Sequence, residues 1–299
     1  MPVIRALRRV PHIPRRIVRE LLVLIQLAWL SLVNRYGRAP VTQPGGPVVS
    51  LTTFGKRSHT VHLAIESIAR GRVLPSRMIL WIDDEAIFGS PPKAIRRLQR
   101  RGLEIKLCTN YGPHTKYYPY VASQEAFPTA FVTADDDILY PRYWLQKLVE
   151  ALLEYPETVN CYWAHVTAVS EEGMGKYADW KLCESTRPSF CHLALGVCGV
   201  IYPPSFLTVL KRAGSSFKLC CPRTDDLWLH VQAIRAGYRV RQILPRLPYF
   251  SFQGIPETQE IALSRENVTH GNGNDLGVEA TYKETDVQLL RADRALATR

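Results

Sequence analysis

Between residues 48 and 155, short apolar runs alternate with segments whose apolar side chains recur every three or four positions. The first pattern predicts buried strands and the second predicts amphipathic helices. The expected strands are residues 48–54, 78–82, 103–108 and 130–134. The expected helices are residues 61–70, 91–101, 117–127 and 143–155. Strands that alternate with helices predict an α/β fold, with a mostly parallel sheet flanked by helices.

The second half of the chain has a less regular pattern. Residues 161–169 predict another strand, and residues 195–204 form a β-rich run interrupted by glycines, which permit a bulge or a close approach of the backbone to a ligand. Thr224 is a suitable N-cap for a helix that begins at Asp225. From residue 253 onward the sequence is polar and predicts a loop-like segment.

Three consecutive aspartates, Asp135, Asp136 and Asp137, directly follow the expected strand at residues 130–134. Adjacent like charges repel one another, so each carboxylate needs water or a cation. The C-terminal edge of a parallel sheet is where open α/β folds bind their ligands. Crowded carboxylates at this edge suit Mg²⁺ or Mn²⁺, which proteins commonly share with substrate phosphates. A solvated acidic turn is the alternative interpretation.

The N-terminal segment, residues 1–46, concentrates the positive charge of the chain. It holds eight arginines and one acid, which is +7 of the formal net charge of +11. Residues 21–33 are mostly apolar, but a spanning helix needs about 20 such residues. We therefore expect residues 1–38 to contact an anionic membrane surface through a basic, apolar helix lying in its plane. A helix buried against the main domain is the alternative.

The charge distribution and the cysteine content limit the classes of protein to which this chain can belong. The chain after residue 46 carries only +4, without the basic stripe of a nucleic-acid-binding domain, so we expect no nucleic acid partner. The seven cysteines are an odd number and include no CxxC pair, which favours reduced thiols over a disulfide framework or a zinc site. With the basic segment, this predicts a location at the cytoplasmic face of the cell membrane.

The order of these motifs resembles the GT-A nucleotide-sugar glycosyltransferases, and among them the bacterial family-2 type. The resemblance rests on Thr-Thr-Phe after the first strand, Asp-Asp after the second, TADDDILYP around the fourth, the glycine-rich strand and Thr-Asp-Asp at a helix start. It implies a GT-A (Rossmann-like) fold for most of the chain. The expected organisation is a membrane-associating segment at residues 1–46, a GT-A domain at 47–275 and a C-terminal tail at 276–299.

The resemblance implies a divalent cation, Mn²⁺ or Mg²⁺, bound to the diphosphate of a nucleotide-sugar donor. Asp137 matches the direct ligand of the family motif. Asp135 or Asp136 is expected nearer the ribose, and Asp135 is also a candidate metal ligand. His270 occupies the late position where some members of the family place a third ligand.

Other residues match the donor-binding part of the family site. Thr52, Thr53 and Arg57 occupy the place that cradles the nucleotide, although β-propensity alone also explains the threonines. Asp83 ends the second strand, where a base-contacting acid or a helix cap is expected. Lys116 is positioned to pair with the diphosphate, or is a solvated lysine.

Asp225 and Asp226 match the acidic pair that supplies the general base of inverting members, and the family pattern favours Asp226. Capping of the helix by both acids is the alternative. The expected function is metal-dependent sugar transfer from a nucleotide-diphosphate donor to a glycan or a lipid-linked (glycolipid) acceptor, as in polysaccharide biosynthesis. Two other classes stay open: a Mg²⁺-dependent nucleotidyltransferase, and a membrane-tethered protein that binds nucleotides or glycans without catalysis.

Overall fold

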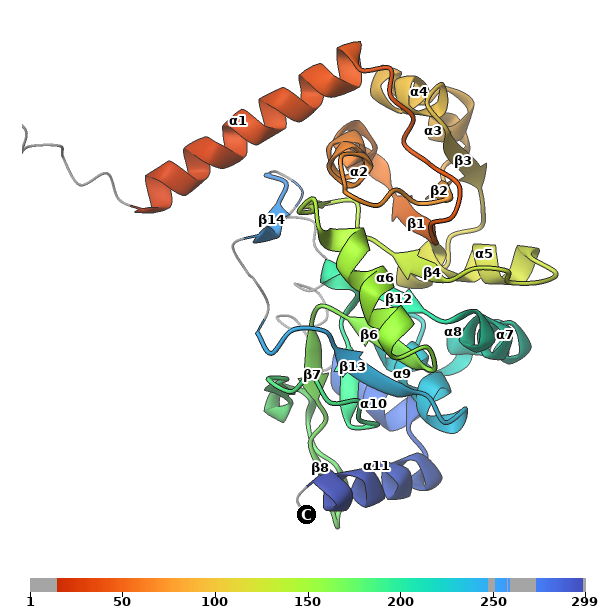
Figure 1. The fold of residues 1–299 in the computed structure, drawn as a ribbon. Coiled ribbons are helices and arrows are strands. Elements are labelled where there is room, and N and C mark those ends of the chain that lie inside the picture. Colours follow the sequence, from red (N-terminus) through yellow and green to blue (C-terminus); the bar gives the residue numbers. More distant parts are fainter. Residues whose placement is uncertain (1–14, 247–250, 257, 259–272, 298–299) are drawn as a thin grey trace, which may run out of the picture.

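A computed structural model describes residues 15–246, 251–256, 258 and 273–297 (Figure 1). Its centre is a seven-stranded sheet with the strand order β13-β6-β12-β4-β1-β2-β3. All neighbouring strands are parallel except β12, which is antiparallel to both β4 and β6. The strands of this sheet are β1 (Val48–Thr53), β2 (Arg77–Ile82), β3 (Leu103–Leu107), β4 (Phe131–Thr133), β6 (Thr158–Cys161), β12 (Val200–Tyr202) and β13 (Arg239–Gln242).

Helices cover both faces of this sheet, as the alternation of buried side chains along β4 illustrates. Phe131 packs into one apolar core, whereas Val132 points to the opposite face and packs into the other. The α/β fold with a mostly parallel sheet flanked by helices is therefore confirmed. The longer helices are α1 (Arg15–Tyr36), α2 (Val61–Ala69), α4 (Lys93–Gln99), α5 (Tyr118–Ser123), α6 (Trp144–Glu154), α7 (Pro204–Ala213), α9 (Asp225–Arg235), α10 (Gly273–Thr281) and α11 (Glu284–Ala297).

Short elements complete the fold. Three small sheets have the orders β10-β7-β11, β14-β5 and β8-β9. Their strands are β5 (Ile138–Leu139), β7 (Ala164–Val166), β8 (Val169–Ser170), β9 (Gly173–Met174), β10 (Lys181–Leu182), β11 (His192–Ala194) and β14 (Gln253–Gly254). The short helices are η2 (Gly55–His59), α3 (Glu85–Gly89), η3 (Gly112–Lys116), η4 (Tyr177–Asp179), η5 (Gly196–Cys198) and α8 (Phe217–Cys220).

The structure differs from the sequence prediction in three places. The expected helix at residues 117–127 ends at Ser123, because Gln124 adopts an extended conformation. The expected strand at residues 161–169 is interrupted, since β6 ends at Cys161, β7 belongs to another sheet and β8 begins only at Val169. The loop prediction for the C-terminal part is wrong at residues 273–297, which form α10 and α11. Helix α10 also runs across the expected boundary between residues 275 and 276.

The two C-terminal helices are held against α9 by polar contacts and by apolar packing. The hydroxyl of Tyr282 lies 2.5 Å from His230 Nδ1, and Arg235 pairs with Asp286 at 2.8 Å. Val287 and Leu290 bury their side chains in the core beside α9. This packing fixes the helix that carries Asp225 and Asp226.

Helix α1 lies across one end of the body, where it contacts α2 and α4 (Figure 1). Its N-terminal part extends beyond the rest of the protein. None of the helices within the described ranges is both long enough and apolar enough to cross a bilayer.

Gly199, just before β12, is the glycine that the fold needs most clearly. Its φ is +97°, and a Cβ added there would lie 2.7 Å from the ring of Trp144. We expect Gly199→Ala to lower the free energy of unfolding by about 2–5 kcal/mol, through backbone strain and overpacking together. Urea denaturation would measure this effect. Gly237→Ala is the matched control, since its φ is +79° and nothing lies within 4 Å of its added Cβ; equal losses would contradict the clash.

Candidate active site

The topology brings several strand ends to one edge of the sheet. Strands β1, β2 and β4 are parallel, so their C-terminal ends meet at this edge. Strand β12 is antiparallel, and its first residue, Val200, pairs with Thr133 at the end of β4. The turn η5 that precedes β12 therefore lies beside the aspartates that follow β4. This edge is where open α/β sheets bind ligands.

Asp136 points into the protein and is only 3% exposed. One of its carboxylate oxygens accepts a hydrogen bond from the Thr53 hydroxyl at 2.7 Å, and the other pairs with Arg57 Nη1 at 2.9 Å. Arg57 Nη2 lies 3.1 Å from Asp137 and also donates to the Thr258 carbonyl oxygen at 3.1 Å. Arg57 thus holds two of the three aspartates and is itself buried.

Lys116, at the end of η3, joins the two acidic motifs. Its ammonium nitrogen lies 3.0 Å from Asp225 Oδ2 and 3.5 Å from Asp135 Oδ1. The hydroxyl of Ser50 in β1 donates to the Lys116 carbonyl oxygen at 2.7 Å, and the Trp81 indole donates to that hydroxyl at 3.0 Å. Burial alone would lower the pKa of Lys116, but the carboxylates of Asp225, Asp135 and Asp226 raise it well above its ordinary value. The lysine is therefore a fixed positive charge.

Asp226 lies next to this ion pair, near the glycine-interrupted turn. Its Oδ1 accepts a hydrogen bond from the backbone N–H of Gly196 at 3.1 Å. A Cβ on Gly196 would come within 2.6 Å of Lys116 Nζ, so a larger residue there would require the lysine side chain to move. Burial, followed by the negative charge of Asp225, raises the pKa of Asp226 to about 8. Asp226 therefore holds its proton more tightly than an ordinary aspartate does.

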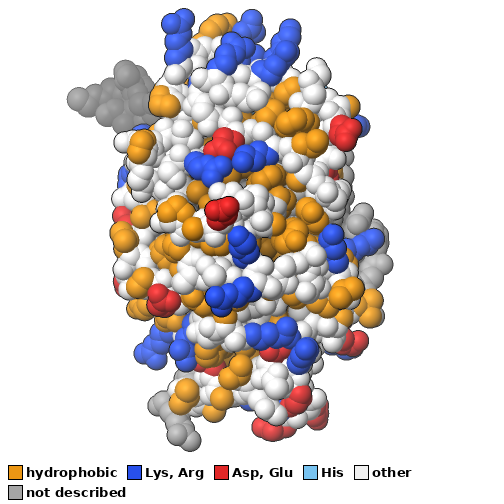
Figure 2. All heavy atoms as spheres, turned by 90° about the vertical axis from the view of Figure 1, so that its right-hand side faces the viewer, with side chains coloured by type: hydrophobic (Ala, Val, Ile, Leu, Met, Phe, Trp, Pro, Cys, Tyr) orange, Lys and Arg blue, Asp and Glu red, His pale blue; other side chains and the backbone are white. Residues whose placement is uncertain are grey.

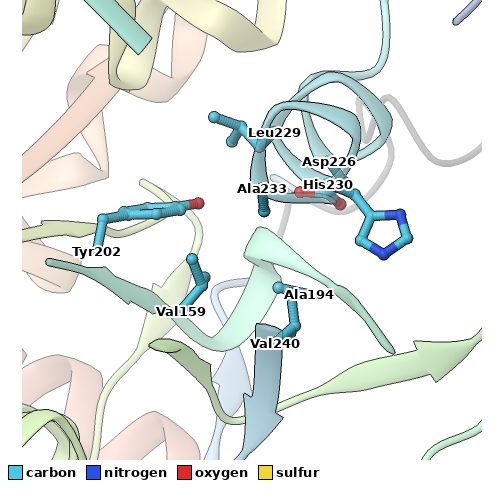
Figure 3. Close-up of a pocket in the computed structure, with 8 residues that line it drawn as sticks. All are labelled: Val159, Ala194, Tyr202, Asp226, Leu229, His230, Ala233 and Val240. Carbon is cyan, nitrogen blue, oxygen red and sulfur yellow. The ribbon is translucent and has the colours of Figure 1, made fainter. Parts of the chain in front are cut away.

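A small cavity of about 10 Å³ adjoins Asp226 beneath α9 (Figure 3). The hydroxyl of Tyr202 points toward it, whereas the His230 ring points away. This volume matches one water molecule and is far too small for a sugar. A substrate would therefore have to approach Asp226 from another side. The cavity is lined by Val159, Ala194, Tyr202, Asp226, Leu229, His230, Ala233 and Val240.

Negative charge exceeds positive charge in this cluster. Two cations, Arg57 and Lys116, contact a group of carboxylates that is larger than they can neutralise. Burial raises the pKa of Asp136, and burial together with Asp135 raises the pKa of Asp137 to about 7. A bound cation would relieve this repulsion. The carboxylates of the cluster are Asp135, Asp136, Asp137, Asp225 and Asp226.

These side chains fit a metal ion only if a bound ligand supplies some of the oxygen atoms that coordinate the ion. Both oxygens of Asp136 are engaged by Thr53 and Arg57, which leaves Asp135 and Asp137 as the candidate metal ligands. The residues that the structure describes include no group of three or more His, Cys, Asp or Glu side chains able to hold a metal. Mg²⁺ is usually bound by one or two carboxylates together with substrate phosphates and water. A cation here would need such phosphate oxygens.

Three of the predicted site residues are not placed in this cluster. Thr52 donates its hydroxyl to the Trp81 carbonyl oxygen at 3.4 Å, away from the aspartates. Asp83 directly follows β2 at the same edge, but it is Asp84 that caps α3 by accepting from two backbone N–H groups. Burial, and then Asp84, raise the pKa of Asp83. His270 lies outside the described residues, so its role as a ligand stays a prediction.

Sequence reasoning missed several supporting residues. Ser50 holds the backbone of Lys116, and the Tyr140 hydroxyl accepts from the Asp135 N–H at 2.7 Å. Thr258 contacts Arg57 from a segment about 200 positions away. Tyr140 lies in the same short motif as the aspartates, which is a usable signal. The other two contacts have no counterpart in the local sequence.

The chain matches no model of a protein family, and no curated protein matches it. The candidate site must therefore be interpreted from its own geometry.

Proposed function

We propose that this protein is a metal-dependent glycosyltransferase of the GT-A type, which transfers a sugar from a nucleotide-diphosphate donor to a glycan or lipid-linked acceptor. One observation carries the proposal. Lys116 lies within 3.5 Å of Asp135 and within 3.0 Å of Asp225, so two acidic motifs 90 positions apart belong to one site. Sugar transfer needs two such groups, one for the leaving diphosphate and one for the acceptor.

In this proposal the turn after β4 holds the donor diphosphate. Asp135 and Asp137 would hold Mn²⁺ or Mg²⁺. Asp136 would hold Arg57 in position through their ion pair. The ion, when bound, neutralises the negative charge that grows on the leaving diphosphate. Without it, the surplus of carboxylates would repel a diphosphate.

Asp226 is the general base in this proposal. The acceptor oxygen forms a bond to the anomeric carbon while the bond from that carbon to the diphosphate oxygen breaks, and the acceptor hydroxyl proton passes to Asp226. A carboxylate whose pKa is raised to about 8 is a stronger base than an ordinary aspartate. The Gly196 N–H holds its Oδ1, which fixes the orientation of the carboxylate. Asp225 is paired with Lys116 and serves to position the lysine.

Donor binding tests the proposal without knowledge of the acceptor. We expect one member of a panel of nucleotide sugars to raise the melting temperature in the presence of Mn²⁺ and to have little effect without it. A ligand at 100 times its Kd stabilises the folded state by about 2.7 kcal/mol. A panel in which no nucleotide sugar binds would contradict the proposal.

Asp137→Ala should abolish Mn²⁺-dependent donor binding, because it removes one of the two candidate metal ligands among the residues that the structure describes. We expect the Kd of the donor to rise by at least tenfold, which corresponds to about 1.4 kcal/mol, in isothermal titration calorimetry. Asp179→Ala is the matched control, since Asp179 is an exposed aspartate in η4. Unchanged Mn²⁺-dependent binding by the Asp137 variant would remove Asp137 from the site.

A further inference from the structure

Helix α1 leaves a large apolar face uncovered. In the described part of the chain, fifteen large apolar side chains are exposed, and seven of them lie on this one helix. Their exposed fractions run from 45% to 69%. We call this set the outer face of α1, and it consists of Leu21, Leu22, Leu24, Ile25, Trp29, Leu32 and Tyr36.

The opposite face of α1 is fixed to the body, so the helix cannot turn to bury its outer face. Leu30 is completely buried and packs in a small core that includes Leu63 of α2. Asn34 is also buried, where its amide donates to Glu66 at 3.0 Å and its oxygen accepts from Arg97 Nε at 2.9 Å. These contacts lock α1 to α2 and α4.

Helix α4 places a basic cluster beside the C-terminal end of α1. Four side chains line a hollow of about 290 Å³, and α4 itself contains no acidic residue. Figure 2 shows Lys and Arg side chains gathered at the end of the molecule where α4 lies. We call this the α4 basic cluster, and it consists of Lys93, Arg96, Arg97 and Arg100.

More arginines border the outer face near its middle. The guanidinium carbon of Arg70 lies 5.4 Å from the centre of the Trp29 ring. The Nε of Arg142 donates to the Arg70 carbonyl oxygen at 3.2 Å, so a second arginine lies beside Arg70. The apolar face is thus bordered by positive charge in two places.

We propose that the outer face of α1 and the α4 basic cluster together dock on an anionic lipid bilayer, with α1 lying in the plane of the interface. An apolar helix face combined with basic side chains is what binds headgroups and the upper acyl region at once. The attachment of the inner face to the body excludes insertion of the helix on its own. This inference does not rest on sugar transfer, because neither donor nor acceptor takes part in docking.

Sedimentation of the full chain with lipid vesicles tests the inference. We expect binding to vesicles of phosphatidylcholine mixed with phosphatidylserine, and weak binding to phosphatidylcholine alone. Ile25→Glu and Leu32→Glu should each abolish the binding, because they place a charge in the apolar face. Leu153→Glu is the matched control, since Leu153 is 77% exposed on α6 and lies outside the proposed surface.

The charge contribution needs its own pair of variants. Replacing Lys93, Arg96 and Arg100 with alanine should weaken binding to the mixed vesicles by about 100-fold, since each basic residue near the surface contributes about 1 kcal/mol. The same charge change at Lys176, Lys181 and Arg187, which lie far from α4 in the chain and outside the proposed surface, should have little effect. Equal weakening by both triple variants would overturn the assignment of α4 to the docking surface.

Two further results would overturn the inference. One is wild-type protein that does not sediment with the mixed vesicles. The other is a wild-type dimer in analytical ultracentrifugation that Ile25→Glu converts to a monomer, with no vesicle binding by either protein. In that case the outer face would be a contact between two copies of the chain.

A fluorescence measurement tests the position of Trp29 at the bilayer. A blue shift of tryptophan emission on vesicle addition, absent in Trp29→Phe, would support the docking surface, and an unchanged shift in this variant would oppose it.

Discussion

Asp226→Asn is expected to lower the rate of sugar transfer by about 10²- to 10⁴-fold, the usual contribution of a positioned general base. Asparagine has the same size, and its side-chain oxygen still accepts the hydrogen bond from the Gly196 N–H. It cannot take a proton from the acceptor hydroxyl. We therefore expect kcat to fall while the Kd of the donor stays unchanged. Steady-state kinetics and calorimetry on the same variant would measure both.

The same substitution should change how stability depends on pH. Because the pKa of Asp226 is about 8 in the folded protein and 3.8 in its ordinary state, the folded protein holds the proton more tightly between these values. The stability that this group contributes is present below about pH 4 and is lost as the pH rises toward about 8. Asp226→Asn should therefore unfold at higher urea concentration than wild type at pH 9. Full transfer activity in this variant would show that Asp226 is not the base.

Lys116→Met should destabilise the protein strongly, because Lys116 is buried between the two acidic motifs. Methionine has a similar length but leaves Asp135 and Asp225 without their shared cation. Removing one partner of a buried ion pair typically costs about 3–5 kcal/mol. We expect a loss of this size in the free energy of unfolding at pH 7, and a smaller loss at acidic pH, where protons neutralise the carboxylates.

Lys147→Met provides the control for that prediction. Lys147 pairs with Glu150 at 2.7 Å, a shorter distance than either contact of Lys116, but both side chains are largely open to solvent. An exposed pair of this kind contributes at most about 1 kcal/mol. The loss in the free energy of unfolding, measured by urea denaturation, should therefore be several-fold larger for Lys116→Met than for Lys147→Met. Similar losses would mean that Lys116 is solvated and does not hold the two acidic motifs together.

The sequence was sufficient to predict the strands that carry the site. The expected strands at residues 48–54, 78–82 and 130–134 correspond closely to β1, β2 and β4, because each is a buried apolar run bounded by polar residues. The aspartates follow β4 at the edge where the C-terminal ends of the parallel strands meet, as the pattern predicts. Local sequence determines these features, and tertiary contacts did not change them.

The direction of each carboxylate was not predictable in the same way. Asp136 faces inward because Thr53 and Arg57 bind both of its oxygens, and these partners lie about 80 positions away. The junction made by Lys116 likewise depends on how η3 packs over β1 through Ser50. Such contacts form only in the folded protein, and the spacing of apolar and polar residues in the sequence does not predict them.

The sequence analysis failed to predict the C-terminal helices for a different reason. Val287 and Leu290 have the spacing of one face of a helix, and both are buried against the body. The surrounding charged residues, such as Glu284 and Asp286, made the segment look like a polar tail. Asp286 in fact pairs with Arg235 of α9 at 2.8 Å. This ion pair holds Asp286 against α9, although the local sequence suggests an exposed residue.

The most direct test of the proposed transfer follows the β-phosphate of the donor. Nucleotide sugars labelled at this phosphate would be incubated with the protein, Mn²⁺ and candidate acceptors, and the labelled product identified. Glycosyl transfer breaks the bond between the sugar and the diphosphate, so we predict that the label appears in a nucleoside diphosphate and that Asp226→Asn forms it far more slowly. Label in a sugar phosphate, from cleavage between the two phosphates, would contradict glycosyl transfer and indicate a nucleotidyltransferase.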